Sequence, residues 1–401
     1  MSPLWSGRVE GDLAAEVWAF LKSEDADLLP YDVEGTRLHA QRLHEAGLLD
    51  NAELADVNER LDRIDFDDLE SSDEDVHSAI ERLLGPVGRK IHAGRSRNDQ
   101  VATAHRLYVQ DACEEAIVGL RAFAHVVLER AEAEAETAMP AYTHLQRAIP
   151  VTLGHHLLAW SEMLERDVAR FAFARAQAEP LPLGAGAVAG STLELPPVDM
   201  PMRNSIDAVA DRDFVLNYLY ACAALFVHLS RISEELVLWT TSEFGFAKLP
   251  EHAATGSSMM PQKLNPDVAE LARGKAGTAI GRLAGLLATV KGLPLAYNSD
   301  LAEDKQATFR ARRDVRLALA ALAILVEGLA FDREHLAAAA ADPLLRATDA
   351  AEALVEQGVP FRDAHEQVAA QVREGTFQAP ELRARSFDVA ASVKAAKERW
   401  A

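Results

Sequence analysis

Apolar positions recur along this chain at the intervals expected of helix faces. From residue 153 they follow at spacings of 4, 3, 4, 4 and 3, namely Leu153, Leu157, Trp160, Leu164, Val168 and Phe171. These spacings place the side chains on one face of a helix with near-heptad character. The pattern predicts a long helix that packs against other helices in a bundle.

Other stretches carry similar long patterns. One runs from about residue 213 to 243, and another continues from Gly94 to about Thr137. A third begins after Pro266 and has apolar residues at spacings of 3, 4 and 3, namely Ile280, Leu283, Leu287 and Val290. Alternating patterns typical of strands are nearly absent. We therefore expect an all-α fold with a central bundle of long helices.

Shorter helical patterns flank the long ones and suggest three helical domains. The shorter patterns lie near residues 12–23, 31–46, 346–357, 361–373 and 386–399. Asp50 with Glu53 three residues later indicates a capping-box helix start, and Asp75 indicates another helix start. The predicted domains are residues 1–94, the long-helix residues 95–335, and a small helical C-terminal domain, residues 336–401.

Composition limits the possible functions. The 401 residues are 49% hydrophobic and 26% charged, which is typical of a globular protein. The formal charge of −21, from 41 basic and 62 acidic residues, argues against nucleic-acid or acidic-membrane partners. The longest apolar run, residues 317–326, is too short to span a bilayer. An anionic substrate would need a local basic pocket.

Cysteine content and the glycine-rich segment exclude further classes. Cys113 and Cys222 show neither a disulfide framework nor metal-ligand spacing, so we expect reduced thiols and no metal. The N-terminus lacks the apolar core of a signal peptide, which predicts a cytoplasmic protein. The glycines within residues 182–190 have no surrounding βαβ pattern, which argues against nucleotide binding.

A polar, glycine-led loop, residues 256–267, is the first candidate for chemistry. Asn265 suits a helix N-cap and Pro266 suits the first helical position. Ahead of them lie Ser257, Lys263 and several free backbone N–H groups. Such donors can hold a carboxylate and stabilise charge that develops on it.

Two further stretches carry polar groups next to helix starts. Arg95, Ser96 and Asn98 follow Gly94 at the beginning of a long helical pattern, where an anion would be stabilised. His144 lies in residues 140–150, which we interpret as a loop bounded by prolines. Histidine is readily tuned near neutral pH, and a carboxylate partner would raise its basicity.

Together these stretches resemble the signature motifs of the argininosuccinate lyase branch of the fumarase and aspartase superfamily. The matching strings are GSSMMPQKLNPD, HAGRSRNDQVAT, YTHLQRAIPV, DEDVHSAIER and YNSDLAEDK. Residues 4–8 resemble the short extended opening of these enzymes. The resemblance covers roughly residues 4–331 and becomes weak beyond them.

The resemblance implies a reversible anti β-elimination that releases fumarate, and no cofactor is expected. Ser257 would be the base, and His144 would pair with Glu270 and transfer the proton to the leaving nitrogen or orient the group that does. The implied substrate-binding residues are Arg95, Ser96, Asn98, Thr143, Lys263, Asn265, Tyr297 and Lys305. It also implies a homotetramer with a twenty-helix core, in which three chains build each active site.

Two departures from the family pattern, at positions expected to meet the substrate, leave the substrate open. Leu21 and Ala302 replace an expected serine and glutamine that meet the substrate, and Ala104 replaces an aspartate. The first hypothesis is cleavage of argininosuccinate to fumarate and arginine. The second is a fumarate-releasing lyase for another N-succinyl compound, such as adenylosuccinate. The third is a non-catalytic relative of the crystallin kind, which retention of the catalytic set disfavours.

Overall fold

The computed structural model describes residues 13–381 and 388–400, so the extended segment expected at residues 4–8 lies outside it. The fold is mainly helical, as predicted. The chain forms two compact units. Unit 1 comprises Met1–Ile117, Ala169–Ala224 and Gly277–Val315, and unit 2 comprises Val118–Val168, Leu225–Ala276 and Arg316–Ala401.

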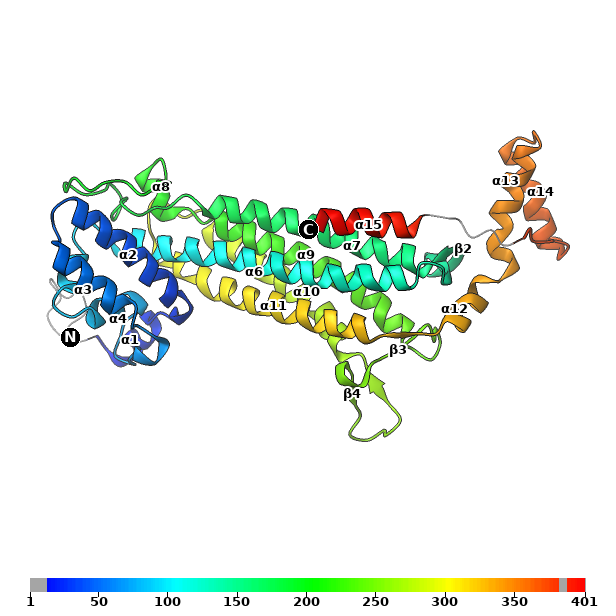
Figure 1. The fold of residues 1–401 in the computed structure, drawn as a ribbon, viewed down its shortest axis with the longest axis horizontal. Coiled ribbons are helices and arrows are strands. Elements are labelled where there is room, and N and C mark those ends of the chain that lie inside the picture. The colour runs from blue at the N-terminus through cyan, green and yellow to red at the C-terminus, as the bar shows by residue number, and fades with distance from the viewer. Residues whose placement is uncertain (1–12, 382–387, 401) are drawn as a thin grey trace. The chain divides into compact units, whose positions relative to one another are not determined.

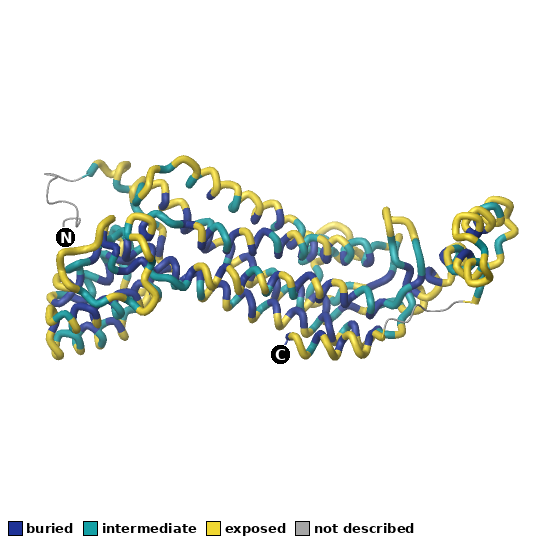
Figure 2. Tube along the Cα trace, turned by 90° about the horizontal axis from the view of Figure 1, so that it is seen from above, coloured by how far each residue is buried: buried dark blue, intermediate teal, exposed yellow. Residues whose placement is uncertain are grey.

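Five long helices are labelled in Figure 1. Each of them has residues in both units. They are α6 (Arg97–Ala133), α7 (Leu153–Ala178), α9 (Asp213–Trp239), α10 (Asp267–Val290) and α11 (Asp304–Gly328). Buried and exposed positions alternate along them, as expected of helices with one apolar face (Figure 2). On α7 five of the six predicted apolar positions are buried, and Val168 is half-buried. The long helices predicted from the apolar spacing are confirmed.

Helix α10 leaves several large apolar side chains open to solvent. Its buried positions are mostly alanines, such as Ala272 and Ala276. Ile280 and Leu287, which belong to the predicted apolar stripe, are 49% and 48% exposed, and Leu271 is 67% exposed. Within one chain, part of the apolar face of α10 therefore has no cover.

Unit 1 adds several shorter helices to its parts of the long ones. They are α1 (Ala15–Leu21), α2 (Leu29–Glu45), α3 (Asn51–Leu61), α4 (Val76–Leu83), α5 (Gly88–Ile91) and α8 (Ser205–Ala210), with 3-10 turns η1 (Ala26–Leu28), η2 (Phe66–Asp68) and η4 (Ser299–Glu303). Asp50 and Asp75 form capping boxes at the starts of α3 and α4, where the sequence predicted a capping box at Asp50 and a helix start at Asp75. The local capping chemistry thus fixes where these helices begin.

Unit 2 contains a β-hairpin where the sequence suggested a loop. Strands β1 (Ala138–Thr143) and β2 (Gln146–Thr152) pair antiparallel, with Pro140 opposite Pro150. The register shifts between Pro140 and Tyr142. Proline cannot donate a backbone hydrogen bond to a ladder. This two-stranded ladder tolerates Pro140 and Pro150 because the outer edge of each strand needs no donor and because a bulge interrupts the pairing after Pro140. The loop interpretation of residues 140–150 was therefore wrong.

The remaining elements of unit 2 are short strands and C-terminal helices. The strands are β3 (Ala247–Lys248) with β6 (Ala330–Phe331), and β4 (Thr255–Gly256) with β5 (Leu264–Asn265). The helices are α12 (Arg333–Ala340), α13 (Ala347–Glu356), α14 (Phe361–Glu374) and α15 (Val389–Trp400), with turns η3 (Glu251–Ala253) and η5 (Pro343–Arg346). Helices α13 and α14 form a hairpin with its own small core, and Arg399 of α15 donates to Glu165 of α7 (Figure 1). The short C-terminal helices predicted from the sequence are confirmed.

Helix α9 is long and apolar enough by composition to cross a membrane, with a mean hydropathy of 1.3 over its most apolar window. Of that window, 56% is buried inside the protein. The buried side chains include Phe214, Tyr218 and Phe226. Packing within a helical bundle accounts for this apolar character.

Candidate active site

The side chains that the sequence singled out fall into two groups, one in each unit. Unit 2 holds Thr143, His144, Ser257, Lys263, Asn265 and Glu270. Unit 1 holds Arg95, Ser96, Asn98, Tyr297 and Lys305. The two groups have different surroundings.

Ser257 opens the loop between β4 and β5. Its Oγ accepts hydrogen bonds from the backbone N–H groups of Met259 and Met260, at 3.2 and 2.9 Å. Donors aimed at an oxygen favour its charged form, so this geometry suits a serine that must become an alkoxide. The loop is open to solvent, with Met259 88% exposed. A ligand could therefore reach Ser257.

The base of this loop is closed by the β4–β5 pair. The side-chain amide of Asn265 donates to the carbonyl of Gly256 and to Oγ1 of Thr255, both at 3.4 Å. The backbone N–H of Lys263 donates to the carbonyl of Met260 at 3.1 Å, while its side chain is exposed. Helix α10 begins at Asp267, directly after Pro266. The loop thus holds Ser257, Lys263 and Asn265 together ahead of a helix N-terminus.

His144 lies in the turn of the β1–β2 hairpin, between the paired residues Thr143 and Gln146. Both turn residues have left-handed backbones, with φ of 55° for His144 and 57° for Leu145. Type I′ hairpin turns require positive φ at both positions, which normally selects Asn and Gly. Side chains larger than glycine cost roughly 1–2 kcal/mol each in this conformation. The hairpin presents Thr143 and His144 to solvent at the expense of local strain.

Glu270 lies in the first turn of α10 and is 47% exposed in its side chain. Its ion partner is Arg273, at 3.9 Å, and Arg273 donates more closely to Glu234, at 2.6 Å. Among the described residues of one chain, no contact joins Glu270 to His144. The expected pair is therefore not formed within a single chain.

In unit 1, the polar side chains at the start of α6 form hydrogen bonds with other groups of the same chain. Arg95 is 9% exposed and donates to Oγ1 of Thr36 at 3.0 Å. Ser96 Oγ accepts the N–H of Asn98 at 3.3 Å, and the Asn98 amide donates to the carbonyl of Ala187 at 3.3 Å. The polar groups that the sequence predicted to bind an anion are thus fixed by the protein's own contacts.

The glycine-rich segment 182–190 is anchored to the same helix start. Asp99 Oδ2 accepts the backbone N–H groups of Gly184 and Gly186, at 3.0 and 2.9 Å. Gly184 has φ of 109°, and a Cβ there would lie 2.8 Å from the guanidinium of Arg42. This position requires glycine for both reasons. The segment is thereby anchored to the start of α6 as a structural linker.

Tyr297 and Lys305 flank the turn η4 and differ in accessibility. Tyr297 is half-buried, whereas Lys305 is only 6% exposed and lies 3.1 Å from Oδ1 of Asp304. Burial opposes the charge on Asp304, but Lys305 and His105 outweigh it and hold the pKa of this carboxyl well below its usual range. Within the chain, Lys305 is committed to an ion pair.

A buried cluster behind Arg95 escaped sequence analysis. Nδ1 of His77 lies 2.8 Å from a carboxylate oxygen of Asp32, which also accepts from the amide of Gln100 at 2.9 Å. Burial disfavours the charged imidazole, but Asp32 outweighs it and raises the pKa of His77. The segment DEDVHSAIER marked His77, whereas a buried aspartate on a helix such as α2 resembles a surface residue in sequence. This cluster supports Arg95 from within.

Comparison with known protein sequences assigns the chain to a family. A family described as Lyase matches residues 22–281, and a second described as Argininosuccinate lyase C-terminal matches residues 344–397. The argininosuccinate lyase of Synechococcus sp. (strain JA-3-3Ab) is 46% identical over 92% of this chain and 80% of its own. That of Frankia casuarinae is 48% identical over 91% of this chain and 83% of its own.

Solved structures agree with the sequence relatives. An EDDS lyase variant with bound fumarate has a TM-score of 0.80 and 27% identity, over 97% of this chain and 90% of its own. EDDS lyase in complex with formate has a TM-score of 0.78 and 29% identity, over 98% of this chain and 85% of its own. Both hold small carboxylates. The chain belongs to the argininosuccinate lyase family of the fumarase and aspartase superfamily and is a carbon–nitrogen lyase.

Proposed function

We propose that the protein cleaves L-argininosuccinate to fumarate and L-arginine by anti β-elimination. The observation that carries the assignment is the Ser257 oxygen, which accepts two backbone N–H groups in an exposed loop ahead of α10. Two donors of this kind favour loss of the hydroxyl proton, and the resulting alkoxide can then remove a proton from carbon. We also propose that the protein acts in the cytoplasm, as expected of an acidic chain with two buried thiols.

In the proposed reaction, Ser257 as alkoxide removes a proton from the carbon next to a succinyl carboxylate. The electron pair moves onto that carboxylate, which becomes an aci-carboxylate dianion. Lys263, Asn265 and the loop N–H groups stabilise this charge, and one such donor typically contributes about 3–4 kcal/mol. The pair then forms the double bond of fumarate as the C–N bond breaks.

The leaving nitrogen takes the electrons of the broken bond and needs a proton. We assign this step to the His144–Glu270 unit, either as the acid itself or as the group that orients it. His144 is exposed on its turn, and Glu270 is half-exposed. Both can therefore meet a partner from another chain.

The proposed substrate-binding groups would meet the carboxylates and polar groups of the substrate. They are Arg95, Ser96, Asn98, Thr143, Tyr297 and Lys305, with Lys263 and Asn265 shared with the chemistry. Lys305 would have to exchange its ion pair with Asp304 for a substrate carboxylate. The local cations supply the basic pocket that a chain of charge −21 requires.

We also propose a homotetramer whose active sites are shared between chains. The open apolar positions Ile280 and Leu287 lie on one face of α10, and this face is suited to bury against copies of itself. A Cβ added at Gly277 or Gly281 on the same helix would meet nothing within 4 Å outside the helix's own nearby backbone, so another helix could approach closely. The unformed His144–Glu270 pair supports the same assembly.

Leu21 and Ala302, both exposed, replace polar residues expected at the site, so adenylosuccinate is tested as an alternative substrate. Purified protein should release fumarate, followed by its absorbance, from argininosuccinate and not from adenylosuccinate. The Ser257→Ala protein serves as the blank for contaminating lyases. Fumarate from adenylosuccinate alone would replace the proposed substrate, and none from either compound would reject the proposed activity.

A further inference from the structure

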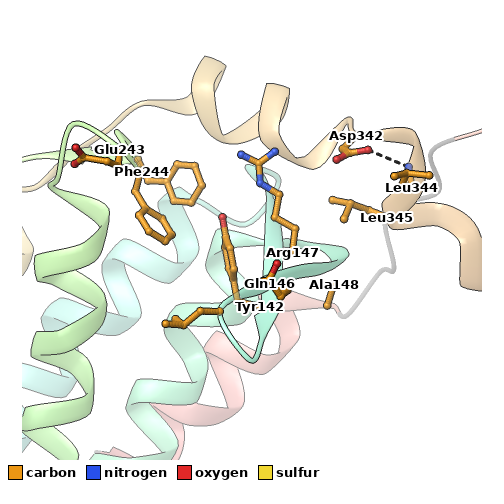
Figure 3. Close-up of a pocket in the computed structure, with 11 residues that line it drawn as sticks. Tyr142, Gln146, Arg147, Ala148, Glu243, Phe244, Asp342, Leu344 and Leu345 are labelled. Carbon is orange, nitrogen blue, oxygen red and sulfur yellow. Dashed lines mark hydrogen bonds between the residues drawn. The ribbon is translucent and has the colours of Figure 1, made fainter.

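A cavity of about 520 Å³ lies in unit 2, between the β1–β2 hairpin, the loop after α9 and the turn η5 (Figure 3). This volume is in the range of small-molecule sites. Its lining combines aromatic rings with charged groups, namely Tyr142, Phe244 and Phe246 with Arg147, Glu243 and Asp342. None of the proposed catalytic or substrate-binding residues lines it.

One wall of the cavity is an aromatic cluster. The rings of Tyr142 and Phe244 have centroids 5.7 Å apart, and those of Phe244 and Phe246 are 5.6 Å apart. These contacts fix the rings against one another. An aromatic wall of this kind accepts an aliphatic chain or the flat face of a cation.

The cationic group of the cavity is Arg147. It is the cross-strand partner of Tyr142, so both side chains rise from one face of the hairpin, as Figure 3 shows. Arg147 is exposed, and no described residue forms an ion pair or hydrogen bond with its guanidinium. A free guanidinium is a forked donor for a carboxylate.

Two carboxylates line the same cavity. Glu243 accepts a hydrogen bond from the hydroxyl of Ser242 at 3.1 Å, and Asp342 accepts the backbone N–H of Leu344 at 3.0 Å. Within the part of the chain that the structure describes, no cation pairs with either carboxylate. The lining therefore presents one positive and two negative groups.

We propose that this cavity binds a dibasic α-amino acid, and specifically L-arginine. At neutral pH such a ligand has one carboxylate and two cationic groups, which is the complement of the lining. The carboxylate would meet Arg147, the two cations would meet Glu243 and Asp342, and the carbon chain would lie along the aromatic wall. A phosphate or dicarboxylate fits poorly, because Glu243 and Asp342 would repel it.

The choice of arginine rests on the proposed function, of which it is a product. Tyr142 and Arg147 also flank the turn that holds His144. A ligand bound to this pair would restrain that turn. The cavity is thereby a place where product can act on the hairpin without occupying the active site.

The test is calorimetric titration of the full-length protein with L-arginine, agmatine and L-citrulline. Agmatine lacks the carboxylate, and citrulline lacks the side-chain charge. Arginine should fill two sites per chain, the proposed active site and this cavity. Glu243→Gln and Arg147→Gln should each weaken the cavity site at least about tenfold, the usual effect of losing one charge-assisted hydrogen bond. Circular dichroism would confirm that both variants fold.

The control is Glu251→Gln, the same charge change on exposed η3 outside the cavity, which should leave both sites intact. Hydrogen exchange locates the site: arginine should slow amide exchange in residues 241–246 of the wild type but not of Glu243→Gln. Equal arginine isotherms in the wild type and both cavity variants, or agmatine binding as tightly as arginine, would overturn the proposal. Persistence of this binding in a protein that cleaves no argininosuccinate would reject the proposed function and leave the site standing.

Discussion

At the scale of single residues, the surroundings of a hydroxyl decide whether it can act as a base. Ser257 Oγ accepts two N–H groups, whereas its neighbour Ser258 lies exposed in the same loop. Backbone donors stabilise an alkoxide without adding a side chain that could itself titrate. This difference gives the two serines different expected roles.

Ser257→Ala should lower kcat by about 10²–10⁴-fold or more, because general-base catalysis contributes at least that much. The dissociation constant for argininosuccinate should change little, since the hydroxyl is not proposed to hold the ground state. Steady-state kinetics with equilibrium binding would measure both. Ser258→Ala should lose far less, and a near-normal kcat in Ser257→Ala would remove Ser257 as the base.

His144→Asn and Glu270→Gln should each impair kcat strongly, and the double variant should be no worse than the poorer single one. Residues that act as a unit give such non-additive losses. Losses that multiply in the double variant would show that the two residues act independently.

The residues that we propose for the chemistry are the ones that the sequence singles out most easily. Ser257, Asn265 and His144 lie in short motifs whose polar spacing is visible in the sequence. Asp32 was missed because its importance comes from burial against His77, and burial depends on how α2 packs on α4. Local chemistry is legible in a sequence, whereas the partner of a buried charge is set by tertiary contacts.

At the scale of elements, the β1–β2 hairpin and the long helices show what a pattern can predict. The helices were predicted because their period is local and repeats over many turns. The hairpin was missed because Pro140 and Pro150 interrupt the alternation, and its turn uses His144 and Leu145 in place of Asn and Gly. Strained turns of this kind are found at functional sites, and their residues differ from the Asn and Gly that usually mark a hairpin turn.

Leu145→Gly should raise the free energy of unfolding by roughly 0.5–1 kcal/mol. Glycine removes the backbone strain of φ at 57°, and the greater entropy that it gives the unfolded chain offsets part of this stabilisation. Urea unfolding would measure it. Leu264→Gly, at an exposed leucine in strand β5, should instead destabilise. A destabilised Leu145→Gly protein would mean that the exposed leucine side chain stabilises the turn more than its backbone strains it.

The Asp32–His77 pair joins helices α2 and α4 behind Arg95. Asp32→Asn should lower the free energy of unfolding by about 3–5 kcal/mol, because it leaves His77 and Arg95 buried without their carboxylate. Asp27→Asn, on exposed η1, is the matched control and should change stability little. An equal effect of both substitutions would reject a specific role for the pair.

The same substitution has a predictable pH dependence. The pKa of His77 is raised above 6.5, so its contribution is complete below 6.5 and is lost as pH rises through the folded value. The pKa of Asp32 is lowered below 3.8, so its contribution is present above 3.8 and is lost as pH falls through the folded value. The stability difference between wild type and Asp32→Asn should therefore be largest between these limits and shrink in alkali.

At the scale of the whole molecule, one chain presents the proposed site in separate parts. Ser257 and His144 belong to unit 2, and Arg95 and Lys305 belong to unit 1. Helix α6 alone has 37 residues, which corresponds to a rise of about 55 Å between its ends. The motifs at opposite ends of such helices can meet when neighbouring chains supply them. The sequence could suggest this assembly only through its family resemblance, since an exposed apolar stripe on α10 becomes visible only in the folded chain.

Subunit complementation tests the shared site most directly. Ser257→Ala and His144→Asn proteins, each inactive alone, are mixed in equal amounts, allowed to exchange subunits, and assayed for fumarate release, with exchange confirmed by native mass spectrometry. If each site takes Ser257 from one chain and His144 from another, about a quarter of the sites in a random mixture draw both residues intact. Activity should therefore recover to about a quarter of the wild-type value. Activity that stays at zero after confirmed exchange would show that one chain supplies both residues and would contradict a site that takes Ser257 and His144 from different chains.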